Sequence, residues 1–111
     1  MATLSELVII DGVATSYGGS ATVASSTNKE YYIPAVCKKV TMQGGLASAG
    51  EFYLEICADP RATIEAGNGY WFNPYVSSLT ASKQCEIEAP VTAVRCRRVS
   101  GSVAFAVLAR G

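Results

Sequence analysis

The sequence contains no histidine, and this absence argues against several kinds of active site. Histidine is the commonest general base, the usual partner of serine and cysteine nucleophiles, and the commonest zinc ligand. Two glycine pairs, Gly18-Gly19 and Gly44-Gly45, lack the spacing and the following helix of a phosphate-binding loop, so we interpret them as turns. The sequence therefore predicts a protein that is not an enzyme, with no catalytic residue, no metal and no cofactor.

Paired cysteine motifs are also absent. Cys37, Cys57, Cys85 and Cys96 include no C-x-x-C pair that could begin a zinc site. No secretory signal is visible, and a reducing compartment disfavours disulfides. We interpret Cys85 and Cys96 as small buried side chains, because both lie on the apolar phase of predicted strands, and we leave Cys57 open.

Long hydrophobic runs are missing as well. The run from Leu7 to Ile10 has no basic residue before it and an acidic residue directly after it, so it predicts a strand and not a signal peptide. No stretch approaches the ~18 apolar residues of a membrane span. We therefore expect no membrane contact, and a protein that stays in the cytosol unless it leaves as part of a particle.

Charge is scarce and balanced. Nine Lys and Arg residues offset nine Asp and Glu residues, so the chain lacks the basic excess that favours nucleic-acid binding. Only 16% of the residues are charged and 50% are hydrophobic, whereas an ordinary domain has about 25% charged residues. Because surplus apolar surface is exposed or covered by another chain, this composition predicts a homo-oligomer or docking onto a larger body.

The plainest strand pattern lies at the C-terminal end. Over residues 92–99, two apolar side chains face one way and two basic side chains face the other, namely Val94 and Cys96 against Arg95 and Arg97. Ser100-Gly101 then predicts a tight turn into a second strand over residues 102–109, which together form a hairpin. The second strand has apolar or small residues on both faces, so we expect it to be buried on both sides or covered by a partner.

Short apolar segments between turn residues predict the other strands, over residues 6–10, 20–24, 29–33, 37–43, 51–58 and 83–89. Their spacing of about 8 to 12 residues predicts one antiparallel β-sandwich over residues 1–111, with roughly eight strands in a jelly-roll or immunoglobulin-like Greek key. Residues 61–78 predict a long ordered loop. An alternative for residues 60–67 is a short helix capped by Asp59.

An aromatic cluster in this loop is the first candidate contact surface, formed by Tyr70, Trp71, Phe72 and Tyr75. Exposed rings on a sandwich loop can stack on sugars. The rings can equally cover the end of the sandwich or lie in a subunit contact, where Trp and Tyr are enriched. We favour the second interpretation. The N-terminal segment is a further candidate contact surface.

The face with Arg95 and Arg97 is another candidate, with two alternatives left open. If the strand over residues 83–89 pairs with the strand over residues 92–99, Glu86 and Glu88 neutralise both arginines across the ladder. If the chain instead crosses at Ala89-Pro90 to the other sheet, the arginines are free to bind an acidic partner.

Two glutamate pairs could in principle serve as a glycosidase acid and nucleophile, Glu51 with Glu55 and Glu86 with Glu88. Alternating strand positions often carry glutamate on the solvated face, so we interpret all four as surface residues.

The last quarter of the chain combines several features in order. These are an acidic alternating strand over residues 85–89, Ala89-Pro90, Val94-Arg95 on a strand, Ser100-Gly101, and a strand of small residues over 103–109. The combination resembles the ending of small β-sandwich proteins encoded among the structural genes of tailed bacteriophages.

The resemblance implies a virion structural protein, assembled in the host cytoplasm, that decorates or cements the capsid shell, often as a trimer. Its partners would be the major capsid protein or other virion subunits, with no direct nucleic-acid contact. The alternatives are a carbohydrate-binding β-sandwich module and a tail or neck component of the virion.

Overall fold

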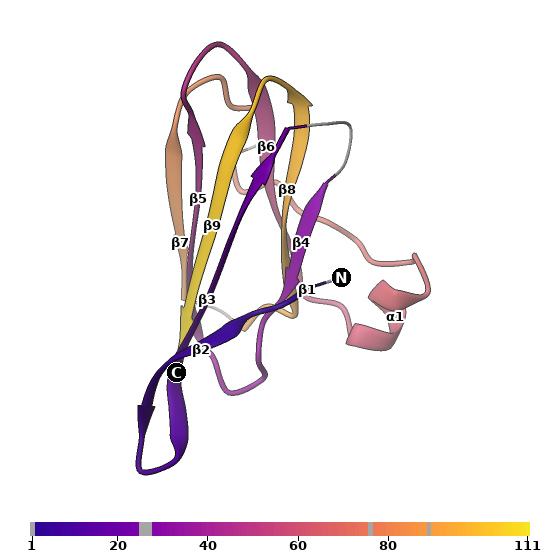
Figure 1. Cartoon of the computed structure of the whole chain (residues 1–111). Helices are drawn as coiled ribbons and strands as arrows, with labels where there is room; N and C mark the ends of the chain where they lie inside the picture. The colour runs from indigo at the N-terminus through magenta and orange to yellow at the C-terminus, as the bar shows by residue number, and fades with distance from the viewer. Residues whose placement is uncertain (1, 25–27, 76, 89) are drawn as a thin grey trace.

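The computed structural model describes residues 2–24, 28–75, 77–88 and 90–111, which form two packed β-sheets (Figure 1). The four-stranded sheet has the order β1 (Ala2–Thr3), β4 (Lys29–Tyr32), β8 (Ala93–Ser100) and β6 (Glu51–Cys57). The five-stranded sheet has the order β2 (Ser5–Ile10), β3 (Val13–Val23), β9 (Val103–Arg110), β5 (Lys39–Leu46) and β7 (Lys83–Ile87). All described strand pairs are antiparallel except β1 with β4. The predicted all-β sandwich is confirmed, with nine described strands in place of roughly eight.

The core lies between the two sheets and follows the alternation of the sequence. Inward positions on β5, β6, β8 and β9 are almost fully buried, as the alternating patterns predict: Val40, Met42, Phe52, Leu54, Val94, Cys96, Val103 and Phe105. Because side chains of a strand alternate between faces, these positions also fix which residues point outward.

The predicted end of a strand at Gly44-Gly45 is wrong, because β5 continues through both glycines to Leu46. The Phe52 ring packs directly against Gly44, where a side chain would overlap it. The predicted strand over residues 20–24 is also too short. β3 begins at Val13 and runs through Gly18-Gly19, where Leu7 covers Gly18 and the Tyr31 ring covers Gly19. Both glycine pairs therefore allow side chains from other strands to approach, and neither forms a turn.

The predicted C-terminal hairpin is wrong in its pairing. β8 and β9 have the expected positions, but β8 pairs with β4 and β6, whereas β9 pairs with β3 and β5. Gly101, with φ of 76°, carries the chain from one sheet to the other. A Cβ on Gly101 would lie 2.7 Å from the carbonyl oxygen of Ala49, so both its φ and its surroundings favour glycine there.

A second crossing separates β7 from β8, since β7 pairs with β5 in the five-stranded sheet. This outcome agrees with the alternative in which the chain crosses near Pro90; Ala89 itself lies outside the described residues. Glu86 and Glu88 are therefore on the opposite sheet from Arg95 and Arg97.

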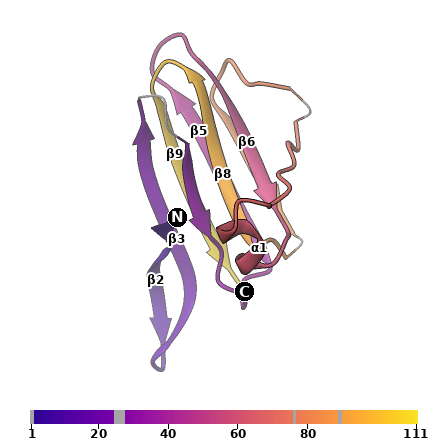
Figure 2. The same cartoon turned by 90° about the vertical axis from the view of Figure 1, so that its right-hand side faces the viewer.

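The segment between β6 and β7 lies beside the four-stranded sheet (Figure 2). It contains α1 (Arg61–Glu65), and two backbone bridges, Ile56 with Phe72 and Phe52 with Leu79, hold the rest of it along β6. The long ordered loop was predicted, and α1 agrees with the alternative of a short helix over residues 60–67; Val76 of the loop lies outside the described residues. The predicted Asp59 cap is wrong, since its carboxylate accepts a hydrogen bond from the Tyr70 backbone nitrogen at 2.7 Å. No helix in the described part of the chain could span a membrane.

Candidate interaction surfaces

The outer face of the four-stranded sheet carries a buried glutamate between two arginines. Glu55 on β6 lies directly opposite Arg95 on β8, and its side chain accepts from Arg95 Nη2 at 2.8 Å and from Arg97 Nε at 3.2 Å. Glu55 is only 6% exposed. A carboxylate at this depth is stabilised by the two charge-assisted hydrogen bonds.

Aromatic rings cover both arginines. The Arg95 guanidinium lies 4.2 Å from the centre of the Trp71 ring, and the Arg97 guanidinium lies 4.0 Å from the centre of the Tyr53 ring. Both distances fit cation–π contacts. We call these five residues, including Glu55, the arginine–aromatic cluster.

This cluster corrects two predictions. The arginines do not become free when the chain crosses between sheets, because Glu55 takes the role that was assigned to Glu86 and Glu88. Glu55 is also not on a solvated face. Glu86 and Glu88 instead pair with Lys39, whose Nζ lies 2.6 Å from Glu86 Oε1 and 3.5 Å from Glu88 Oε1.

The aromatic residues of the predicted contact surface lie in three different surroundings. Trp71 is half-buried and packs on a small second core of Tyr32, Cys57, Ile64 and Ala93. Tyr70 and Phe72 are 66% and 51% exposed and form an edge-to-face pair with centroids 4.7 Å apart.

Tyr75 lies apart from this pair. It packs on the main core, and its hydroxyl donates to the carbonyl oxygen of Gln84 at 2.6 Å. Burial raises the pKa of Tyr75 to about 12, with smaller contributions from Cys85. The structure thus brings Trp71, Arg95 and Arg97 together, and it leaves Tyr70 and Phe72 as an exposed pair.

The outer face of the five-stranded sheet is a second surface, with β9 at its centre. Its middle consists of three rows across β3, β9 and β5: Gly18, Leu108 and Thr41; Ser20, Ala106 and Gln43; and Thr22, Ala104 and Gly45. None of these nine residues is charged, and most have small side chains. We call them the neutral sheet face. The sequence predicted that the last strand would be covered, and Leu7, on β2, reaches over this face at Gly18.

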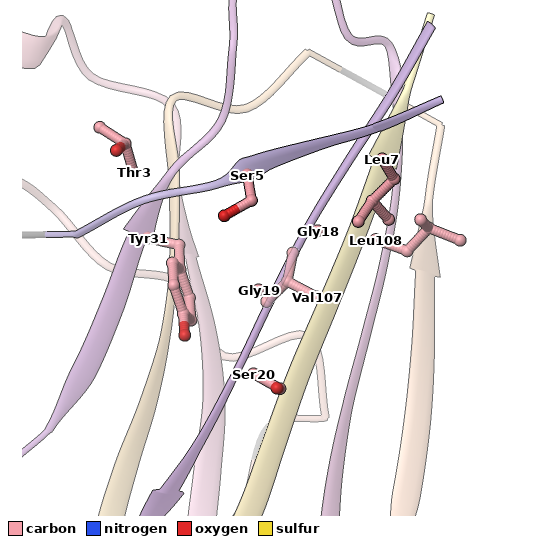
Figure 3. A pocket seen from close by; sticks show the side chains of 9 residues that line it. All are labelled: Thr3, Ser5, Leu7, Gly18, Gly19, Ser20, Tyr31, Val107 and Leu108. Atoms are coloured by element: carbon pink, nitrogen blue, oxygen red, sulfur yellow. The ribbon is translucent and has the colours of Figure 1, made fainter. Parts of the chain in front are cut away.

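Leu108 lines two shallow hollows. One hollow, of about 650 Å³, extends from Leu7, Gly18 and Ser20 to Thr3 and Tyr31 of the four-stranded sheet (Figure 3). The other, of about 310 Å³, is lined by Thr41, Gln43, Gln84 and Ala106. Leu108 lines both and is 39% exposed, so it is the most apolar point of the neutral sheet face.

All four cysteines are unpaired, and three are buried: Cys37, Cys57 and Cys96. Cys96 faces the main core, as predicted, and Cys57 belongs to the second core beneath Trp71. No group of three or more Cys, Asp and Glu side chains that could hold a metal occurs among the described residues.

The buried thiols should be unreactive in the folded protein. Burial raises the pKa values of all three, and that of Cys96 to about 12, with a smaller effect from the Glu55 carboxylate. Near neutral pH we expect a thiol reagent to modify Cys85 before the other three, and all four after denaturation. Because the folded pKa of Cys96 exceeds its ordinary value of 9.0, the stability linked to it is complete below that pH and is lost as pH rises through about 12. Rapid modification of Cys96 in the native protein would contradict this burial.

No protein-family model matches the chain, and no curated protein matches it in sequence. The surfaces described above, together with the pattern at the C-terminal end, are therefore the basis for a functional proposal.

Proposed function

We propose that this protein is a non-enzymatic virion subunit that binds the head shell of a tailed bacteriophage and stabilises it. The observation that supports this proposal most directly is the neutral sheet face. It is a broad strip of nine uncharged positions on the outside of a folded domain. The sequence pattern at the C-terminal end resembles that of small phage β-sandwich proteins, and this resemblance is the reason for proposing a phage head as the assembly to which the protein binds.

The neutral sheet face suits contact with a larger protein surface. Docking there would remove no charged side chain of this protein from water, so the contact avoids the cost of desolvating an ion. Glu86 on β7 lies directly opposite Thr41, at the edge of this face, and forms an ion pair with Lys39 on β5, which corresponds to the polar rim of an ordinary interface. Many copies on one shell would add their weak contacts.

The arginine–aromatic cluster indicates that the four-stranded sheet has a structural role and is not the docking side. Its charges are satisfied within the chain by Glu55, so it braces the four-stranded sheet and the adjoining loop. We therefore propose the five-stranded sheet as the side that faces the major capsid protein. In this proposal the protein reaches the virion after assembly in the host cytoplasm and contacts neither nucleic acid nor membrane.

Binding to shells tests the proposal. Purified protein is mixed with shells assembled from the major capsid protein of the same genome, and bound protein is measured by co-sedimentation. We expect Ala106→Arg to weaken binding at least tenfold, because it places a charge in the centre of the neutral sheet face. Ala62→Arg is the matched control, since Ala62 is exposed on α1 beside the other sheet. Absence of binding by the unaltered protein, or equal binding by Ala106→Arg, would contradict the proposal.

Carbohydrate binding is a second candidate function, favoured by the exposed pair Tyr70 and Phe72. The half-buried Trp71 is less suited to stacking on a sugar, because Arg95 occupies one face of its ring. Loss of glycan binding in Tyr70→Ala, with shell binding absent, would favour this alternative. Binding to tails or necks in place of heads would favour a different position in the virion.

A further inference from the structure

We call the hairpin of β2 and β3, residues 5–16, the arm; its outer part, beyond the last pairing of β3 with β9 at Ser16, extends past the end of the sandwich body (Figures 1 and 2). Its large apolar side chains are exposed: Leu7 by 55%, Ile9 by 57%, Ile10 by 58% and Val13 by 65%. Nine large hydrophobic side chains are exposed among the described residues, and six of them lie on this arm or next to it, when Val36 and Leu108 are included. A concentration of this kind marks an interaction site.

The arm has little support from its own chain. The pairing of β3 with β9 ends at Ser16 and Arg110, so β3 from Val13 to Thr15 has only β2 as a neighbouring strand. A two-stranded ribbon is marginally stable in water by itself. The tip is well defined, however, because Asp11 and Gly12 have φ values of 52° and 76°, as in the two-residue turns that match strand twist.

A mainly apolar hollow of about 420 Å³ lies at the base of the arm. Its lining comes from β3, from the loop between β4 and β5, and from the residue after β9. The lining residues are Val13, Ala14, Thr15, Tyr17, Val36 and Gly111. The hollow therefore offers apolar surface of the same kind that the tip exposes. Within one chain the tip cannot enter it, because Val13 and Ala14 belong both to the arm and to the lining.

Charge distinguishes the two surfaces. The charged residues of the arm are both acidic and exposed, Glu6 and Asp11. Lys38, an exposed basic residue, lies two positions after Val36 of the hollow, and its backbone nitrogen donates to the carbonyl oxygen of Arg110 at 3.0 Å, next to Gly111 of the hollow. In the described part of the chain, Lys38 has no ion-pair partner. An acidic apolar tip and a basic-rimmed apolar hollow are complementary.

We infer that a second copy of this chain occupies the hollow, with the tip of its arm inserted so that Asp11 lies near Lys38. Exchange between two copies, or a ring of three, would satisfy every tip and every hollow. This contact goes beyond the proposed function, because it joins copies of the chain and does not involve the shell. Leu7 lies on the arm and also covers Gly18 of the neutral sheet face, so association would place several such faces together.

The mass of the full-length protein, measured by sedimentation equilibrium over a range of concentrations, tests the inference. We expect a dimer or trimer for the unaltered chain. We expect Ile10→Thr/Val13→Thr to weaken association at least tenfold, because threonine keeps the branched shape that strands favour but removes apolar surface. Both positions are exposed in the single chain, so the fold should be retained, as circular dichroism would verify. Val99→Thr is the matched control, since Val99 is 47% exposed on β8, away from the arm.

A double-mutant cycle tests the position of the tip. Asp11→Asn keeps a residue that tolerates positive φ, and Lys38→Gln removes the opposing charge. Each change alone should weaken association about two- to fivefold, as is usual for an exposed ion pair. The two changes together should weaken it no further than either alone. Independent, additive effects would show that the tip and this rim do not meet, and would overturn the inference.

Two other outcomes would also overturn it. One is a chain that stays monomeric at the highest concentration reached. The other is an arm variant that associates normally but no longer binds shells, since the occupant of the hollow would then be a shell subunit. Normal association of the unaltered chain without any shell binding would contradict the proposed function and support the contact between copies.

Discussion

Replacing Glu55 by glutamine should lower the free energy of unfolding by about 3 kcal/mol, the lower end of the cost of removing one partner from a buried ion pair. The expected loss of stability arises because Arg95 and Arg97 lose the carboxylate that pairs with both of them. The Arg95 side chain is only 17% exposed, so without Glu55 it is a charge held away from water that has lost its ion pair, and Glu30, opposite it on β4, is the acid left beside it. The Arg97 side chain is 42% exposed and can turn to solvent, which keeps the cost at the lower end. Urea denaturation of the two proteins measures the difference.

Two further variants identify the cause. Glu86→Gln is the matched control: it removes a glutamate that also lies on a strand and pairs with one basic residue, Lys39, but at an exposed site. Its denaturation midpoint should stay close to that of the parent. Arg95→Met in the Glu55→Gln background should recover stability, because it removes the uncompensated charge and keeps an apolar contact with Trp71. Equal effects of Glu55→Gln and Glu86→Gln would show that the carboxylate of Glu55 is not needed.

The position of Glu55 shows what the sequence could not reveal about the site. Alternation correctly placed Glu55 on the face opposite Phe52 and Leu54, and Arg95 on the face opposite Val94. It could not show that β6 is the neighbour of β8, because strand pairing between residues forty apart leaves no local signal. It also could not show that the loop with Trp71 would cover that face. A face that is polar in sequence is therefore buried in the structure.

The fold class was predictable because alternation of apolar and polar residues is a local signal. Inward residues such as Val40, Met42, Val103 and Phe105 repeat with a period of two, and each is at most 1% exposed. The pairing of the last two strands was not predictable, because Ser100-Gly101 suits both a hairpin and a crossing between sheets. In the structure Ala49 and Gly50 lie where a Cβ of residue 101 would be, a contact between distant segments that no local pattern shows.

The sequence named the N-terminal segment as a candidate contact surface and predicted cover for the last strand, but it could not show the arm or the neutral sheet face themselves. Leu7, Ile9 and Ile10 form a normal strand pattern, and normal strands bury one face. Leu7 is exposed because β2 is an edge strand, and Ile9 and Ile10 are exposed because β3 extends past the end of its neighbour β9, which ends its pairing opposite Ser16. Strand length, and not residue type, creates this candidate contact.

Gly44→Ala should be strongly destabilising, by about 2 to 3 kcal/mol, although alanine is usually preferred to glycine in a strand. Gly44 faces the core, and a methyl group there would overlap the Phe52 ring, which is fully buried. The ring cannot move aside, because close packing surrounds it on every side. The neighbouring Gly45→Ala is the matched control. The nearest atom to its added methyl group would be Ser82 Oγ at 3.8 Å, an ordinary contact.

Gly45→Ala should therefore be neutral or stabilising by up to about 1 kcal/mol, since alanine restricts the unfolded chain more than glycine does. Both glycines lie in β5 without positive φ, so the two substitutions differ in packing and not in backbone strain. Phe52→Leu should relieve the overlap, and the double variant Gly44→Ala/Phe52→Leu should lose less stability than the sum of the two single changes. Strict additivity, measured by urea denaturation, would mean that Gly44 and Phe52 do not touch. The continuation of β5 through two glycines would then need another cause.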